Sequence, residues 1–291
     1  MISCANDFEK FLSNLRMNDT DEKNKSIRFH SITKRLNIDF WEVYDDTYHS
    51  FYTGSQARGT DIYTSDIDMV MVLPYNIYER YNNYSYNGQS ALLQAVRASL
   101  QKTYPSTYIG GDGQVVVVEF SDGMKFEVVP AFLNDDNTSY TYPDSNDGGK
   151  WKIMDPKTEI KAFNDMDKAC NNNIKQLCKM IREWNKVNNV GLKGILIDSM
   201  AYRFLSDYQY KDKSFLYYDY MTRDFFKYIY DNYDQSFWYA PGSNWKVYNS
   251  GGFRNKAEYA YELALAAIEA ASNDSQNKYS ECWREIYGRK F

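Results

Sequence analysis

The segment from Tyr52 to Pro74, YTGSQARGTDIYTSDIDMVMVLP, constrains the fold of this chain more than any other. Residues 49–53 have the aromatic and β-branched composition of a short strand, which Gly54 and Ser55 end with a tight turn. The run that ends at Leu73 is apolar at successive positions, as in a strand that is covered on both faces. The segment therefore predicts a short strand, a turn and a buried central strand.

The turn has the composition of an anion-binding site. Gly54 allows a ligand to approach the backbone closely. The residues from Ser55 to Gly59 can form one helical turn whose free N–H groups, together with the Ser55 hydroxyl, point at a ligand. A Gly-Ser pair alone is more often an ordinary turn, so the interpretation depends on the acids that follow.

Two carboxylates, Asp66 and Asp68, lie where the second strand begins. The two-residue period of a strand places both side chains on one face. Their charges repel strongly in a medium less polar than water, whereas a bound Mg²⁺ lets both stay ionised. An Asp-x-Asp pair alone is more often solvated, but its combination with the turn predicts one site for a triphosphate with Mg²⁺, for which Mn²⁺ can substitute.

A third acid is predicted on a hairpin further along the chain. Residues 114–130 have the composition of two strands joined by a turn, and the second strand can deliver Glu127 beside the first two acids. Two alternatives remain. Glu119 lies on the partner strand, where it can point to the opposite face, and Asp122 is a residue type that turns favour.

The remaining segments are predicted to be mostly helical. The polar segment 133–149 marks the boundary between a first domain, residues 1–145, and a second domain, residues 146–291. Ser90 is the expected cap of one helix in the first domain. Helices are predicted for residues 6–17, 20–37, 90–102, 164–188, 194–205 and 253–271.

Composition argues against several classes of protein. The 291 residues are 43% hydrophobic and 25% charged, as in an ordinary soluble protein. No apolar run is long enough to span a membrane, and the start of the chain lacks a signal peptide, so we expect a cytoplasmic protein without membrane contact. The net charge of −5 argues against a long nucleic acid as a partner. The four cysteines lack the spacing of a zinc site, which predicts reduced, mostly buried thiols.

The motifs resemble those of the polymerase-β-type nucleotidyltransferase superfamily. Their wording is similar to that of the bacterial cyclic-oligonucleotide synthases related to animal cyclic GMP-AMP synthase, and the resemblance covers most of the chain. The motifs are Thr53-Gly54-Ser55, Arg58-Gly59-Thr60, Ser65-Asp66-Ile67-Asp68, Phe126-Glu127-Val128-Val129-Pro130-Ala131-Phe132, Tyr142-Pro143-Asp144, Gly148-Gly149-Lys150-Trp151 and Ile181-Arg182-Glu183-Trp184-Asn185.

The resemblance implies an α+β fold, in which a polymerase-β-like nucleotidyltransferase lobe with a mixed sheet is followed by a helical C-terminal lobe that closes the nucleotide cleft. It implies an enzyme that joins nucleoside triphosphates into a cyclic di- or trinucleotide second messenger in antiphage defence, with regulatory protein partners from an antiphage operon. A template-independent transferase that modifies RNA or protein, and a nucleotide-binding module without turnover, remain alternatives.

The resemblance also implies roles for individual residues. Asp66 and Asp68 are the first two metal ligands and catalytic acids. Glu127 is the third, at a position that is commonly Asp in the family. Thr53 belongs to the nucleotide-binding turn with the Gly-Ser pair that follows it.

Basic residues of the second half are the expected ligands of the triphosphate. Lys179 and Arg182 lie one turn apart on the basic face of helix 164–188, where family members place a basic residue on the triphosphate. A charged face of a helix is usually only its solvated side, which is the alternative here. Lys193, just before the helix 194–205, is a third candidate.

Overall fold

The fold is taken from a computed structural model, which describes residues 2–64, 66–249 and 251–291. Ser65, which belongs to the predicted motif, lies outside the described residues. The chain forms two compact units, which are described in turn. We call Met17–Ala57 with Thr64–Thr158 the sheet unit, and Met1–Arg16 with Arg58–Tyr63 and Glu159–Phe291 the helical unit.

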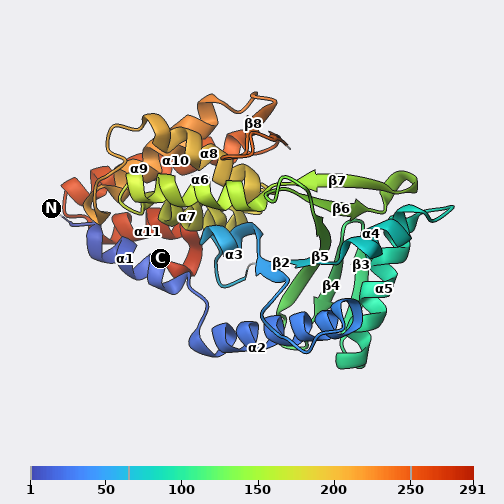
Figure 1. The fold of residues 1–291 in the computed structure, drawn as a ribbon. Coiled ribbons are helices and arrows are strands. Elements are labelled where there is room, and N and C mark those ends of the chain that lie inside the picture. The colour runs from blue at the N-terminus through green and yellow to red at the C-terminus, as the bar shows by residue number, and fades with distance from the viewer. Residues whose placement is uncertain (1, 65, 250) are drawn as a thin grey trace. The chain divides into compact units, whose positions relative to one another are not determined.

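A mixed seven-stranded sheet forms the centre of the sheet unit (Figure 1). Its strands are β1 (Ser50–Tyr52), β2 (Ile67–Val72), β3 (Tyr108–Asp112), β4 (Val115–Glu119), β5 (Lys125–Leu133), β6 (Tyr140–Asp144) and β7 (Lys150–Met154). The order is β1-β2-β5-β4-β3, and β6 pairs with both β5 and β7. Because β2 and β5 are parallel and their other neighbours are antiparallel, the sheet is mixed, as predicted.

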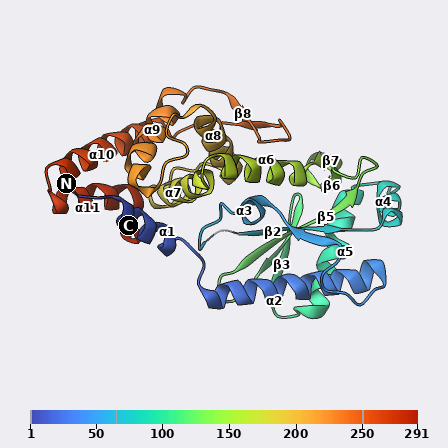
Figure 2. The same cartoon turned by 60° about the vertical axis from the view of Figure 1, so that its left-hand side comes forward.

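Helices α2 (Asp19–Leu36) and α5 (Gly88–Thr103) cover one face of this sheet (Figures 1 and 2). The two helices and the sheet share an apolar core in which Ile32, Val96 and Phe126 are fully buried. The chain continues from α2 as a π-helix (Asn37–Trp41), and α4 (Tyr75–Asn82) precedes α5. The large core holds β2 and β5 in place from this side.

The opposite face of β2 and β5 carries a smaller apolar cluster around Val70, Ala131 and Tyr140. Side chains alternate between the two faces of a strand, so Asp68 and Glu127 lie on this second face. Both side chains are half-buried there. The core on the face covered by α2 and α5 therefore holds the two strands in place, and the two acids stay partly accessible on the opposite face.

The helical unit is built from seven helices of the described chain (Figure 2). Its core is rich in aromatic side chains, and Phe8, Trp184, Phe226 and Trp283 are buried in it. The helices are α1 (Ala5–Asn14), α6 (Pro156–Ala169), α7 (Asn173–Val187), α8 (Gly194–Asp207), α9 (Tyr218–Asp231), α10 (Arg254–Ser272) and α11 (Gln276–Tyr287), and a hairpin is formed by β8 (Phe237–Tyr239) and β9 (Lys246–Tyr248). Short 3-10 turns occur in this unit at Phe215–Tyr217 and Gly288–Lys290, and in the sheet unit at Asn146–Gly148.

The division into units differs from the predicted boundary after residue 145. Phe8 of α1 is fully buried in the core of the helical unit, so the N-terminal helix belongs there. At the other end, β6 and β7 extend the sheet past the predicted boundary. The polar composition of residues 133–149 predicted a domain boundary, but part of this segment forms strand β6.

Several elements differ from their predictions for local reasons. The helix predicted for residues 164–188 is two helices, α6 and α7, because Asn171 and Asn172 have φ of +53° and +63° between them. Helix α5 begins before Ser90, and the side chain of Asn87 caps it by accepting from Ser90 N at 2.8 Å. Strand β3 contains Gly110 and Gly111, and α11 follows the last of the predicted helices.

Two expectations from composition can be compared with the structure. All four cysteines are free and buried, as predicted. In the described residues, the helices are too short or too polar to cross a membrane.

Candidate active site

The turn after β1 brings the backbone against one of the acids. Gly54 begins the short helix α3 (Gly54–Arg58) with φ of +59°. Thr53 N donates to the carbonyl oxygen of Asp68 at 2.9 Å, which ties the turn to β2. A Cβ atom on Gly54 would lie 1.9 Å from Oδ2 of Asp68, so only glycine fits here. The predicted turn and the predicted acid are thus in direct contact.

The parallel pairing of β2 with β5 brings the acids together. Asp68 is the register partner of Glu127, and registered residues on neighbouring strands point to the same face. Asp66 lies just before β2. Lys125 Nζ lies 3.2 Å from Oδ2 of Asp66 and 2.6 Å from Oε1 of Glu127, so both carboxylates reach one point. The structure places Asp68 and Glu127 on one face of two adjacent strands, and Lys125 connects Glu127 to Asp66.

Lys125 is a residue of this site that the sequence interpretation missed. The signal was present, because Lys125 and Glu127 are two residues apart on one strand and so share a face. The hydrogen bond to Glu127 and the nearby charge of Asp66 raise the pKa of Lys125 well above its usual range. The ammonium group therefore acts as the local counter-ion of two acids.

The residues at this site fit a divalent cation. Two carboxylates, Asp66 and Glu127, already converge on the positive charge of Lys125, and Asp68 lies beside Glu127. Mg²⁺ is commonly bound through one or two carboxylates together with substrate phosphates. In the residues that the structure describes, no three His, Cys, Asp or Glu side chains are grouped closely enough to hold a metal alone. This arrangement suits a metal that arrives with a triphosphate.

The two alternative acids are placed differently from the predicted three. Glu119 pairs in register with Lys125, so it shares the face of Glu127 and does not point to the opposite one. It is exposed and lies on β4, on the far side of β5 from β2. Asp122 lies in the hairpin turn, where Arg28 donates to both of its oxygens at 2.9 and 2.8 Å. Neither acid lies next to β2.

Arg182 has a different environment from the predicted one. Its guanidinium group is buried and donates to Asp198 at 2.6 and 2.9 Å and to the carbonyl oxygen of Gly194 at 3.1 Å. Arg58, also buried, donates to the same carboxylate at 2.8 Å. A phosphate-binding role does not fit a guanidinium group that is buried and already paired. The structure instead gives Arg182 the role of connecting α7 to α8.

Lys179 and Lys193 keep environments that suit an anion. Lys179 is half-buried, and burial lowers the pKa of its ammonium group although the charge of Asp61 opposes this. No ion pair of Lys179 or Lys193 occurs among the described residues. Lys193 is exposed and directly precedes α8. Both belong to the helical unit, and their contact with a triphosphate remains a prediction.

Comparison with known sequences identifies relatives. The family model of the Second Messenger Oligonucleotide or Dinucleotide Synthetase domain matches residues 2–167. A probable cyclic nucleotide synthase of Bacillus cereus (strain VD146) is 25% identical over 180 residues, with 57% of this chain and 51% of that protein covered. The match thus spans about half the length of this curated relative.

Solved structures share the fold. CdnC of E. coli MS115-1, solved with ATP, superposes with a TM-score of 0.71 at 14% identity, covering 100% of this chain and 99% of that chain. CdnC has also been solved in a complex with HORMA-deltaN, with a TM-score of 0.70, 13% identity and coverage of 97% and 96%. The cyclic AMP-GMP synthase DncV of Vibrio cholerae, in complex with a linear intermediate, gives a TM-score of 0.67 at 17% identity, covering 83% of this chain and 68% of that chain.

These likenesses confirm the predicted fold class and the predicted resemblance. The turn, the two acids of β2 and the third acid of β5 all lie inside the matched residues 2–167. The matched part is more than half of the 291 residues. The chain belongs to the Second Messenger Oligonucleotide or Dinucleotide Synthetase family.

Proposed function

We propose that this protein is a Mg²⁺-dependent nucleotidyltransferase that joins nucleoside triphosphates into a cyclic di- or trinucleotide. The observation that carries this proposal is the convergence of Asp66 and Glu127 on one cation, beside Asp68 and its contact with Gly54. A synthase among the relatives and the linear intermediate bound to DncV support the same class of reaction.

In this proposal the turn binds the leaving group. Gly54 lets the phosphates approach the backbone, and the Ser55 hydroxyl donates a hydrogen bond to them. Thr53 fixes the turn to β2 through its hydrogen bond to the backbone of Asp68. Lys179 and Lys193 are proposed to neutralise the phosphate charge that faces away from the acids.

The acids position the two reacting groups. A hydroxyl oxygen of one nucleotide attacks the α-phosphorus of the other, a P–O bond forms, and the bond to pyrophosphate breaks. In this proposal Glu127 faces the acceptor hydroxyl and accepts its proton or passes it to solvent. Asp66, Asp68 and Glu127 would hold Mg²⁺ together with the triphosphate, and the metal would supply charge stabilisation for the phosphates and a lower pKa for the hydroxyl. A second transfer of the same kind closes the ring.

Lys125 is proposed to act before the metal binds. Its ammonium group holds Asp66 and Glu127 close together while they are both ionised. This charge is redundant once a divalent cation is bound, so Lys125 is then free to turn toward the triphosphate. It thus preserves the geometry of the acids between turnovers.

The cellular setting is also a proposal. We propose a cytoplasmic enzyme whose product is a second messenger in antiphage defence. Regulatory proteins encoded beside it are the expected partners, and the complex of CdnC with HORMA-deltaN supports this kind of partner. Loss of phage protection in cells that carry Asp68→Asn in place of the wild-type protein would test this setting.

The proposed reaction is tested by product analysis. The protein is incubated with all four nucleoside triphosphates and Mg²⁺ or Mn²⁺, treated with phosphatase and analysed by mass spectrometry. A phosphatase-resistant cyclic di- or trinucleotide is expected. A ladder of extended RNA primers without this product would support an RNA-modifying transferase, and binding without any turnover would support a nucleotide-binding module.

A further inference from the structure

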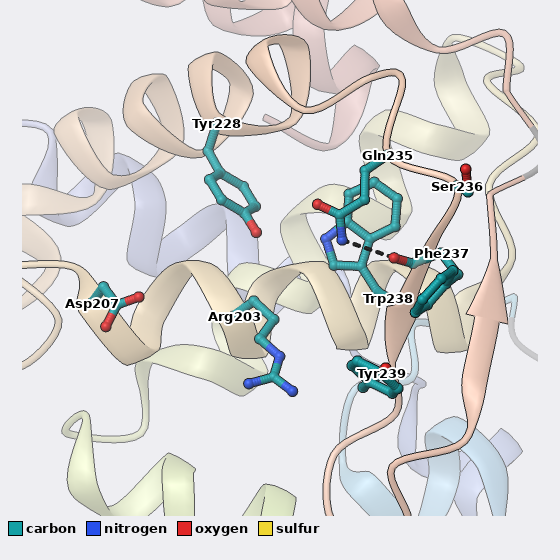
Figure 3. A pocket seen from close by; sticks show the side chains of 8 residues that line it. All are labelled: Arg203, Asp207, Tyr228, Gln235, Ser236, Phe237, Trp238 and Tyr239. Carbon is teal, nitrogen blue, oxygen red and sulfur yellow. Dashed lines mark hydrogen bonds between the residues drawn. The ribbon is translucent and has the colours of Figure 1, made fainter.

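A pocket of about 520 Å³ lies within the helical unit, between α8, α9 and β8 (Figure 3). Its volume is in the range of pockets that bind small molecules, roughly 300 to 1,000 Å³. Arg203 comes from α8, Tyr228 from α9, and Trp238 and Tyr239 from β8. Three separate elements of one compact unit therefore form its walls.

None of the residues that line this pocket was assigned to the proposed triphosphate site. Lys193, a proposed ligand of the triphosphate, directly precedes the first residue of α8. Arg203 lies ten positions further along the same helix, which corresponds to about 15 Å of helix axis. Asp207 ends the helix, one turn beyond Arg203. Both charged residues of the pocket therefore lie in the C-terminal half of α8.

Trp238 gives the pocket a buried hydrogen-bond donor. The side chain is only 1% exposed, and its indole Nε1 has no hydrogen-bond partner among the residues that the structure describes. Figure 3 shows this nitrogen on the side of the ring that faces Tyr228. Buried polar groups are almost always paired, and a buried tryptophan N–H usually finds an acceptor. A ligand with an acceptor at this position would satisfy it.

The mouth of the pocket carries two charges of opposite sign. Arg203 and Asp207 are exposed, and neither forms an ion pair within the described chain. The guanidinium group of Arg203 presents planar donors that match phosphate oxygens. The carboxylate of Asp207 accepts hydrogen bonds from hydroxyl or amino groups. A ligand that fits both carries an anionic group and separate donors.

Aromatic side chains form much of the remaining wall. Tyr239 is 41% exposed, and Tyr228 and Phe237 are half-buried at the pocket. Exposed aromatic faces favour stacking on a planar ring, and every nucleobase offers such a face. The lining therefore combines a stacking surface, a buried donor, a phosphate-binding cation and a carboxylate.

We propose that this pocket binds a mononucleotide. The base stacks on the aromatic wall, and one of its ring nitrogen or carbonyl oxygen atoms accepts from Trp238 Nε1. The phosphate binds Arg203, and ribose hydroxyls or a base amino group donate to Asp207. The proposal does not depend on the proposed reaction, because none of these residues belongs to the acids or the turn.

The test is calorimetric titration of the full-length protein with 5′-AMP and with 5′-GMP in the presence of EDTA, which removes metal-dependent binding. Arg203→Gln and Trp238→Phe are each expected to weaken binding by about tenfold or more. The first removes a charged hydrogen-bond donor to the phosphate, and the second removes the buried N–H that donates to the base. Arg284→Gln, an exposed arginine elsewhere in the helical unit, and Trp245→Phe, in the loop that precedes β9, are matched controls that should bind as the wild type does.

Three results would overturn the proposal. The first is that neither nucleotide binds, and the second is that Arg203→Gln binds them as tightly as the wild type. The third is that benzoate, an aromatic anion without a base or ribose, binds as tightly as the nucleotides. Far-UV circular dichroism checks that Trp238→Phe folds. If that variant is unfolded, Arg203→Gln decides alone, since Arg203 is exposed.

Discussion

Replacement of Asp198 by Asn is expected to destabilise the helical unit strongly. Asp198 is fully buried and accepts from Arg58 at 2.8 Å and from Arg182 at 2.6 and 2.9 Å. Asn keeps the shape but removes the charge, so Arg182 loses its counter-ion and Arg58 keeps only Glu159, at 3.8 Å. Loss of one partner of a buried ion pair costs about 3–5 kcal/mol, and we expect the free energy of unfolding to fall by this amount.

The effect should depend on pH in a defined direction. Burial raises the pKa of Asp198, but the charges of Arg182 and Arg58 outweigh burial and hold this pKa below its usual value. A carboxyl group with a lowered pKa stabilises the folded state above its unfolded pKa, and this contribution is lost as pH falls through the folded pKa. The difference in stability between the wild type and Asp198→Asn should be complete at neutral pH and should shrink only below about pH 4.

Urea unfolding followed by tryptophan fluorescence measures this effect, because Trp184 and Trp283 are buried in the helical unit. Asp207→Asn is the matched control, since Asp207 lies on the same helix but is exposed. The control should change the free energy of unfolding by less than about 0.5 kcal/mol. An Asp198→Asn variant as stable as the control would refute the role assigned to the buried pair.

Substitutions at three further residues test the proposed active site. Lys125→Met should tighten Mn²⁺ binding by about tenfold, equivalent to ~1.4 kcal/mol, because the ammonium group of Lys125 competes with the metal for Asp66 and Glu127. Electron paramagnetic resonance of free Mn²⁺ measures this affinity, and an unchanged affinity would contradict the prediction. Glu127→Ala should lower turnover by about 100-fold or more with triphosphate binding retained, and the turnover of Glu127→Asp should lie between those of Glu127→Ala and the wild type. Steady-state kinetics and a binding titration measure the two effects. Full activity of Glu127→Ala would exclude this acid. Gly54→Ala should abolish triphosphate binding, because the added Cβ would lie 1.9 Å from Oδ2 of Asp68 and the backbone φ at this position is +59°. Calorimetric titration with a triphosphate measures the binding. Wild-type affinity of this variant would refute the close contact.

The sequence predicted the centre of the sheet unit because local patterns and long-range packing agree there. The apolar run at β2 needs cover on both sides, and it lies between β1 and β5 as an inner strand. The residue pattern placed Gly54 in the turn and offered Glu127 as one of three candidate acids, among which the family resemblance selected Glu127. The helix predicted for residues 253–271 is α10, in which Ala257 and Ala264 are fully inaccessible.

The sequence could not predict features that depend on distant partners. Arg182 was predicted to bind the triphosphate from the basic face of a helix, but it is buried and pairs with Asp198 on the next helix. Lys125 was overlooked because its importance comes from Asp66, which is brought near by strand pairing. The buried donor of Trp238 becomes visible only when α8, α9 and β8 are assembled.

The central claim is that Asp66 and Asp68 hold a metal for nucleotidyl transfer. Release of pyrophosphate from nucleoside triphosphates at saturating Mg²⁺ tests it most directly, with Asp66→Asn and Asp68→Asn compared against Glu119→Gln, an exposed acid of the same sheet face. Both Asn variants should lose metal-dependent pyrophosphate release while they remain folded, and Glu119→Gln should keep it. Near-normal pyrophosphate release by either Asn variant would contradict the assignment of these two carboxylates.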